Sequence, residues 1–156
     1  MVSILMCTYN REQYLKRAID SVIAQTYTEW ELIIVDDGST DNTEQLVAFY
    51  PDPRIRYIKM DKNRFYCYAA NYGLQNCRGD YVAFQNSDDE WLPDKLEKQM
   101  RFMEEHTEAG ACFTEVTLID NEGNDLSERC LPMEKLFENH YEDQKDWMHF
   151  FLHKGN

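Results

Sequence analysis

The stretch Ile33-Ile34-Val35-Asp36-Asp37-Gly38-Ser39 decides how this chain is expected to fold, because an apolar run of strand length ends abruptly in polar residues. Two further segments repeat the arrangement. Thr8-Tyr9-Asn10 follows the apolar run 2–7, and Asn86-Ser87-Asp88-Asp89 follows the run 80–85. If these runs are parallel strands of one sheet, all three polar segments leave it at its carboxyl edge, where open α/β folds bind ligands.

That arrangement would gather at least four carboxylates around one crevice. Unpaired carboxylates repel one another, so such a cluster is stable mainly when a cation or hydrogen-bond donors share the site. We therefore expect a hard divalent ion that holds a phosphorylated ligand.

The segments between the apolar runs read as helices and one more strand. Residues 11–25 carry apolar side chains at helical spacing, and Asp41 can cap a second helix with Glu44 three residues later. Residues 54–60 alternate apolar and basic side chains, as in a strand near the side of a sheet. Residues 66–77 read as a helix and residues 80–85 as a strand buried on both faces. This order predicts a mostly parallel, Rossmann-like α/β sheet with helices on both faces.

The later part of the chain continues with a helix over 95–106, with Pro93 at its first position. Residues 111–119 are expected to form a strand and residues 121–124 its turn. From residue 133 onward acidic and aromatic residues, among them Trp147, favour a helix with one buried face. No internal repeat or low-complexity linker interrupts residues 1–156, so we expect a single domain.

Composition excludes several classes of protein. A chain of 156 residues with 43% hydrophobic residues can bury a core, whereas a formal charge of −13 argues against binding nucleic acid or an anionic membrane, since either needs clustered Lys and Arg. Five cysteines without a C-x-x-C pair indicate reduced, mostly buried thiols in a cytosolic compartment. No stretch approaches the roughly 18 apolar residues of a membrane span.

The glycines form neither a G-x-G-x-x-G motif nor a Walker loop, which argues against a dinucleotide fold or a P-loop enzyme. The remaining way to bind a diphosphate is a metal bridge from carboxylates such as Asp88 and Asp89. Asp36 and Asp37 would then contact the ribose or base.

The same segments resemble the start of the large inverting glycosyltransferase family with the GT-A fold. The resemblance covers roughly the first 105 residues, and it rests on residues 2–4, 8–12, 21–27 and 33–41 with Asn71, Gly79-Asp80-Tyr81 and Ser87-Asp88-Asp89. It implies a donor site for a nucleotide sugar, most often a UDP-sugar, with Mn or Mg. It also implies a saccharide or lipid-linked acceptor and a cytoplasmic location, and it leaves open membrane association outside this segment.

Carried over by position, the resemblance places Thr8, Tyr9 and Asp37 in the base pocket. Asp88 would approach the ribose and the metal, and Asp89 would be the metal ligand or its neighbour. The remaining residues expected to bind the nucleotide sugar are Asn10, Asp36, Asn71 and Asn86. This chain departs from the family pattern at three places. Family members usually have an acidic residue where this chain has Asn86. Many also have Gly-Gly near the position of Arg64-Phe65 and an Arg at the position of Ala70.

In the family the general base is a carboxylate in a segment well after the metal motif. Glu142 and Asp143 precede an aromatic helix, so we interpret them as a solvated carboxylate pair at a helix start. Residues 1–156 are therefore expected to be a donor-binding domain that stops before the acceptor segment. The base would lie beyond Asn156, and this segment alone would be inactive.

Alternatives from other classes remain. In a non-catalytic nucleotide-sugar-binding domain, Asn86 and Ala70 would mark lost chemistry. A receiver-like phosphoacceptor domain would need an acid pair after its first strand, where this chain has Thr8-Tyr9-Asn10. His149 and His153 have the spacing of a zinc-binding pair on one helix, but without a third ligand at plausible spacing they read as helix surface or core residues.

Overall fold

The computed structural model describes residues 1–126. The chain divides into two compact units, Met1–Cys112 and Phe113–Asn156. Several residues singled out in the sequence lie outside the described part: Cys130, the segment from residue 133, Glu142, Asp143, His149 and His153.

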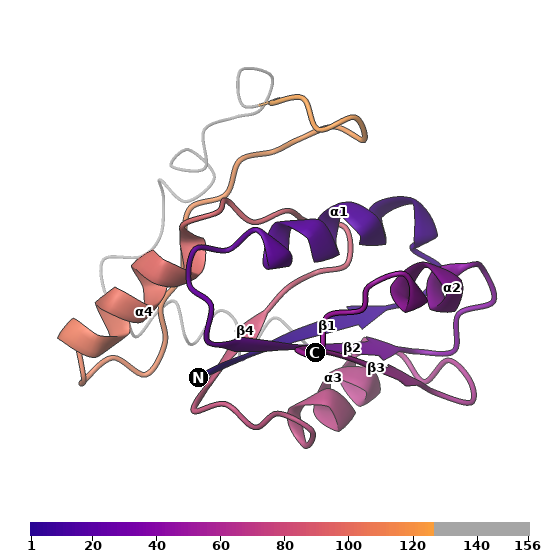
Figure 1. Ribbon diagram of the computed structural model, residues 1–156, viewed down its shortest axis with the longest axis horizontal. Helices are drawn as coiled ribbons and strands as arrows, with labels where there is room; N and C mark the ends of the chain where they lie inside the picture. Colours follow the sequence, from indigo (N-terminus) through magenta and orange to yellow (C-terminus); the bar gives the residue numbers. More distant parts are fainter. Residues whose placement is uncertain (127–156) are drawn as a thin grey trace, which may run out of the picture. The chain divides into compact units, whose positions relative to one another are not determined.

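A four-stranded parallel sheet forms the centre of the first unit (Figure 1). Its strand order is β3-β2-β1-β4, and the strands are β1 (Val2–Thr8), β2 (Trp30–Asp36), β3 (Ile55–Lys59) and β4 (Tyr81–Phe84). The register pairs Thr8 with Asp36, and Asp36 with Lys59. Strand β4 also runs parallel to β1, with Phe84 opposite Leu5. The carboxyl ends of β1, β2 and β4 therefore lie on the same side of the sheet, as predicted.

Helices cover both faces of this sheet (Figure 1). The helices are α1 (Glu12–Ile23), α2 (Thr43–Ala48), α3 (Tyr66–Leu74) and α4 (Lys95–Glu105). Alternation along the strands divides the core: Ile4 of β1 shares a buried cluster with Leu15 of α1, while Leu5 shares another with Ala69 of α3. Because both faces of β1 and β2 are covered, these strands read as continuous apolar runs. The predicted fold class is confirmed.

Strand β4 differs from its prediction. It was expected to be buried on both faces, but Tyr81, Val82 and Phe84 are 37%, 38% and 55% exposed. Among the described strands β4 pairs only with β1, so it is the outer strand of the sheet and its far side has no neighbour there.

Two helix starts also differ. The N-cap of α4 is Asp94, so Pro93 precedes the helix instead of opening it. The N-cap of α2 is Asn42, while Asp41 accepts a 3.1 Å hydrogen bond from the Thr43 N–H. The predicted partner of Asp41 in a capping box is Glu44, and it forms an ion pair with Lys59 on β3.

The prediction of a strand after α4 is also wrong. Residues 111–119 form no strand within the described structure, where Ile119 makes a single antiparallel bridge with Asp125. The predicted turn is present, because the Asp120 carboxylate accepts the N–H of Asn124 at 2.8 Å.

The described thiols are all free but less buried than expected. Cys67 is exposed, and the others are half-buried: Cys7, Cys77 and Cys112.

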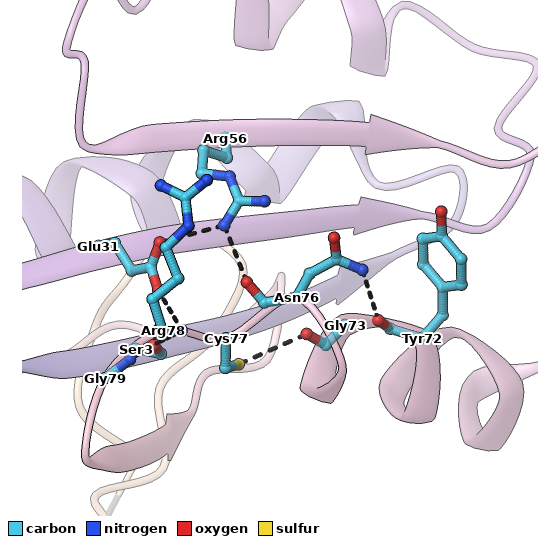
Figure 2. Close-up of polar contacts among 9 residues, drawn as sticks. All are labelled: Ser3, Glu31, Arg56, Tyr72, Gly73, Asn76, Cys77, Arg78 and Gly79. Carbon is cyan, nitrogen blue, oxygen red and sulfur yellow. Dashed lines mark hydrogen bonds and ion pairs between the residues drawn. The ribbon is translucent and has the colours of Figure 1, made fainter.

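A buried polar network ties the amino ends of β1 and β2 to the connection before β4 (Figure 2). Ser3 Oγ donates to Glu31 Oε1 at 2.7 Å, and the Arg78 N–H donates to the same oxygen at 2.7 Å. Arg56 on β3 forms an ion pair with Glu31 at 3.2 Å, and the Gly79 N–H donates to Ser3 Oγ at 2.8 Å. This network lies at the end of the sheet opposite the polar loops.

No helix among residues 1–126 combines the length and the apolar character that crossing a membrane requires.

Candidate functional site

The loops after β1 and β2 form one hydrogen-bonded unit at the carboxyl edge. The Asn10 N–H donates to Ser39 Oγ at 2.9 Å, and Asn10 Oδ1 accepts the Thr40 N–H at 2.9 Å. The Asp37 N–H donates to the Thr8 carbonyl at 2.9 Å. Asn10 adopts a φ of 51°, a left-handed conformation that asparagine tolerates better than most residues. Its side chain therefore links the two loops.

Asp36 turns into the protein. It is 0% exposed, its Oδ1 accepts the Ser39 N–H at 2.7 Å, and its Oδ2 accepts the Tyr57 hydroxyl. A buried carboxylate is tolerated only with such partners. In this structure Asp36 supports the loop from inside, and the neighbouring Asp37 is the carboxylate placed at the edge.

Asp37 joins the second loop to the segment before α3. Its Oδ1 accepts the Arg64 N–H at 2.8 Å. Gly38 has a φ of 79°, and a Cβ there would lie 2.7 Å from the carbonyl carbon of Lys62.

Cys7 lies near the Asp37 carboxylate. Burial, and secondarily the charge of Asp37, raise the pKa of the Cys7 thiol to about 11, so this cysteine stays protonated at neutral pH and is no nucleophile.

Thr8 carries a polar atom without a partner. Its side chain is buried, at 3% exposure, and its Oγ1 makes no hydrogen bond within the described structure. Such orphaned groups are uncommon in native proteins and call for an explanation. The next residue, Tyr9, is 42% exposed, so an unsatisfied hydroxyl and an accessible aromatic ring belong to consecutive residues at the carboxyl edge.

The loop after β4 is held by its own side chains and by Arg11. Asn86 Nδ2 donates to Asp89 Oδ2 at 2.8 Å, and Gln85 Nε2 donates to the Asp89 carbonyl at 2.7 Å. Arg11 Nε lies 3.4 Å from Asp88 Oδ2. This ion pair brings the third loop to the first.

The expectation of four carboxylates around one crevice is wrong for the described residues, which contain no group of three or more His, Cys, Asp or Glu side chains placed to hold a metal ion. The reasons are local, because Asp36 turns inward to Tyr57 and Asp88 is paired with Arg11.

The donors that remain still fit a hard divalent ion. Asp88 and Asp89 offer carboxylate oxygens from one exposed loop, beside the amide of Asn86. Mg²⁺ is usually held by one or two carboxylates together with substrate phosphates, and Mn²⁺ prefers the same oxygen ligands. A preassembled cage of protein ligands is therefore unnecessary.

The structure brings together Thr8, Tyr9, Asn10, Asp36 and Asp37, and the Arg11 ion pair connects them to Asp88. Asn71 lies on α3 with an exposed side chain. Sequence reasoning assigned no role to Arg11 or Tyr57. The alternation of residues 54–60 indicated a strand, but it could not identify the partner of Tyr57.

Comparison with known proteins places these features in a family. The model of "Glycosyl transferase family 2" matches residues 3–153. The putative teichuronic acid biosynthesis glycosyltransferase TuaG of Bacillus subtilis is 40% identical over 128 residues, which are 81% of this chain and 50% of TuaG. The chain thus spans about half the length of this curated relative.

Two solved structures are similar to this chain in fold and in sequence. S. aureus TarS 1–349 in complex with UDP superimposes with a TM-score of 0.65 at 30% identity, over 68% of this chain and 32% of TarS 1–349. The mannosyltransferase PcManGT from Pyrobaculum calidifontis, in complex with GDP-Man and Mn²⁺, gives a TM-score of 0.62 at 25% identity, over 65% of this chain and 32% of PcManGT.

Proposed function

This chain belongs to glycosyl transferase family 2, and we propose that it is the donor-binding part of a metal-dependent glycosyltransferase. The enzyme would transfer a sugar from a UDP-sugar to an acceptor hydroxyl with inversion, in the synthesis of a polysaccharide or glycoconjugate. The observation that carries the proposal is the buried, unpartnered hydroxyl of Thr8 beside Asp37, at the edge where the polar loops meet.

The nucleoside would bind between the first two loops. Thr8 Oγ1 would gain the hydrogen bond it lacks, and Tyr9 would offer its exposed ring to the base. Asp37, oriented by the Arg64 N–H, would accept hydrogen bonds from the base or ribose. We choose uridine over guanosine because this chain is 30% identical to TarS, which was solved with UDP, and 25% identical to PcManGT, which was solved with GDP-Man.

The diphosphate would meet the third loop. The chain carries a formal charge of −13, so a diphosphate beside Asp88 and Asp89 would be repelled unless a cation lay between them. These two carboxylates would hold Mn²⁺ or Mg²⁺ together with the phosphates. When bound, the ion stabilises the charge that develops on the departing diphosphate.

Thermal unfolding with UDP, with MnCl₂ and with both tests the proposal. A metal shared by carboxylate and diphosphate makes each ligand strengthen the binding of the other, so both together should raise the Tm by more than the sum of the separate shifts. Asp89→Asn should abolish this excess. Asp80→Asn is the matched control, because Asp80 lies just before β4, at the end of that strand away from the loop, with an 82% exposed side chain.

Each result has a defined meaning. An unchanged excess in Asp89→Asn, or equal shifts without metal, would contradict the metal assignment. A larger shift with GDP than with UDP would contradict the choice of nucleotide. Binding without sugar transfer by the whole protein, across donors, would favour a non-catalytic nucleotide-sugar-binding protein.

A further inference from the structure

We propose that Tyr57 is a positioning residue for donor binding, which acts through the buried carboxylate of Asp36 on the loops after β1 and β2. The inference rests on the proposed function, since it concerns how the same site is held in shape. Tyr57 lies in the middle of the outer strand β3, and sequence reasoning gave it no role in the site.

The first link is the Tyr57 hydroxyl, which donates to Asp36 Oδ2. Burial, reinforced by this hydrogen bond and by the charge of Asp36, raises the pKa of Tyr57 far above its ordinary value. The hydroxyl therefore keeps its proton and remains a donor throughout the neutral range. Asp36 is 0% exposed, so water cannot readily replace this donor.

From Asp36 the hydrogen bonds run outward to both loops. Asp36 Oδ1 accepts the Ser39 N–H at 2.7 Å, and Ser39 Oγ accepts the Asn10 N–H at 2.9 Å. Asn10 Oδ1 in turn accepts the Thr40 N–H at 2.9 Å. We call these four residues, Tyr57, Asp36, Ser39 and Asn10, the loop relay. The relay connects an outer strand to the loop that carries the residues proposed to contact the base.

The buried carboxylate of the relay indicates a role beyond holding β2 and β3 together. Burying a carboxylate is costly, and apolar side chains of similar volume would join β2 and β3 at least as stably. A carboxylate instead accepts from two fixed directions, so it orients the Ser39 N–H and the backbone on either side of Asp37. Hydrogen bonds of this kind behind a binding site hold its contact residues in the productive geometry.

Tyr57→Phe removes the hydroxyl and leaves one oxygen of Asp36 without its donor. The carboxylate should then rotate, and the loops should lose their fixed positions. Tyr50→Phe is the matched control, because the Tyr50 hydroxyl donates to Asp20 Oδ1 at 2.8 Å, a bond between the segment after α2 and α1 that involves no residue of the site. Both variants lose one tyrosine–aspartate hydrogen bond.

Isothermal titration of the whole chain with UDP in the presence of MnCl₂ measures the effect. Mutating a residue that orients the ligands of a metal site typically costs about 10–100-fold in metal affinity or activity. By analogy with the lower end of that range, we expect about a tenfold rise in Kd for Tyr57→Phe. Tyr50→Phe should stay within about twofold of wild type, as expected for a change away from the site.

Hydrogen exchange supplies a second measurement that a general loss of stability would not reproduce. Tyr57→Phe should reduce protection of the Ser39 and Asn10 amides while amides of the buried β2 strand, such as Ile33, keep theirs. Should Tyr57→Phe fail to fold, Ser39→Ala interrupts the same relay at its next link, removes the acceptor of the Asn10 N–H, and leaves both bonds of Asp36 in place.

The outcomes separate the two proposals. If wild type binds UDP with Mn²⁺ and Tyr57→Phe binds as tightly as Tyr50→Phe, the relay inference is wrong. Unchanged protection at Ser39 and Asn10 would overturn it as well. If wild type does not bind UDP with Mn²⁺, the proposed function fails, and the exchange data still decide whether Tyr57 positions the loops.

Discussion

The backbone N–H of Arg64 donates a 2.8 Å hydrogen bond to Oδ1 of Asp37, and this bond fixes the backbone that leads into α3. The next residue, Phe65, has a φ of 68° and a ψ of 159°. Its own N–H donates to Asn63 Oδ1 at 3.0 Å. This region of backbone space is essentially restricted to glycine, so Phe65 is strained and its neighbours hold it there.

Phe65→Gly should stabilise the protein. Relief of the strain is worth roughly 1–3 kcal/mol, and the flexibility of glycine in the unfolded chain offsets about 1 kcal/mol. The Phe65 ring is 80% exposed, so its loss removes little packing. Urea unfolding should show a net gain of about 1 kcal/mol. Phe65→Ala is the control, since it removes the ring but keeps the Cβ that causes the strain. A Phe65→Gly variant less stable than Phe65→Ala by about 1 kcal/mol, the cost of glycine flexibility alone, would show that the backbone is not strained.

Gly38→Ala should destabilise the protein strongly. A Cβ at Gly38 would lie 2.7 Å and 2.8 Å from backbone atoms of Lys62 and Asn63, at a φ of 79°. Backbone atoms cannot rotate away, so we expect a loss of about 2 kcal/mol or more in urea unfolding. Gly110→Ala, where a Cβ would meet nothing within 4 Å, should change stability by less than about 0.5 kcal/mol. Similar losses in both variants would rule out the tight approach at Gly38.

The strands that could be predicted from sequence are those whose own side chains report burial. Residues 2–7 and 31–35 are continuous apolar runs because helices cover both faces of β1 and β2. Residues 111–119 show a similar apolar character, but a strand needs a partner at the right distance, and local pattern does not report one. In the described structure only Ile119 makes a bridge.

The sequence predicted which loops form the candidate site, but it did not predict the contacts that their side chains make. Three polar segments after three apolar runs correctly located the carboxyl edge. Side chains alternate along a strand, so Asp36, two residues after Ile34, lies on the same face of β2 and points inward. Its partner became visible only with the register, which pairs Ile34 with Tyr57. Register between strands depends on packing of the whole sheet, which the local sequence does not contain.

Arg11→Gln should tighten Mn²⁺ binding modestly. The guanidinium of Arg11 lies 3.4 Å from Asp88 and competes there with a cation. Both side chains are about half exposed, at 47% and 46%, so their pairing is worth at most about 1 kcal/mol, or roughly a fivefold change in Kd. Titration with Mn²⁺ followed by electron paramagnetic resonance measures this. Arg54→Gln, which breaks the ion pair with Asp52, should leave Mn²⁺ binding unchanged. Weaker binding in Arg11→Gln would mean that Arg11 assists the ion instead.

The buried Glu31 should make stability depend on acidic pH. Burial on its own would raise the pKa of Glu31, but the hydrogen bonds from Ser3, Arg78 and Arg56 outweigh it and hold the pKa below its ordinary value of 4.5. A carboxyl group whose pKa is lowered by folding contributes stability above its unfolded pKa. That contribution is lost as the pH falls through the folded pKa.

Glu31→Gln should therefore cost the most stability at neutral pH, by about 2 kcal/mol for lost hydrogen bonds to a charged group. The difference from wild type should shrink as the pH falls from 4.5 through the lower pKa of the folded state, because the wild-type carboxyl group is protonated first in the unfolded chain and then in the folded protein. Urea unfolding across the acidic range measures this. Glu29→Gln, at an exposed position, should show almost no difference at any pH. A Glu31→Gln difference that stayed constant with pH would mean that its cost comes from packing, and that the network in Figure 2 does not depend on the charge of Glu31.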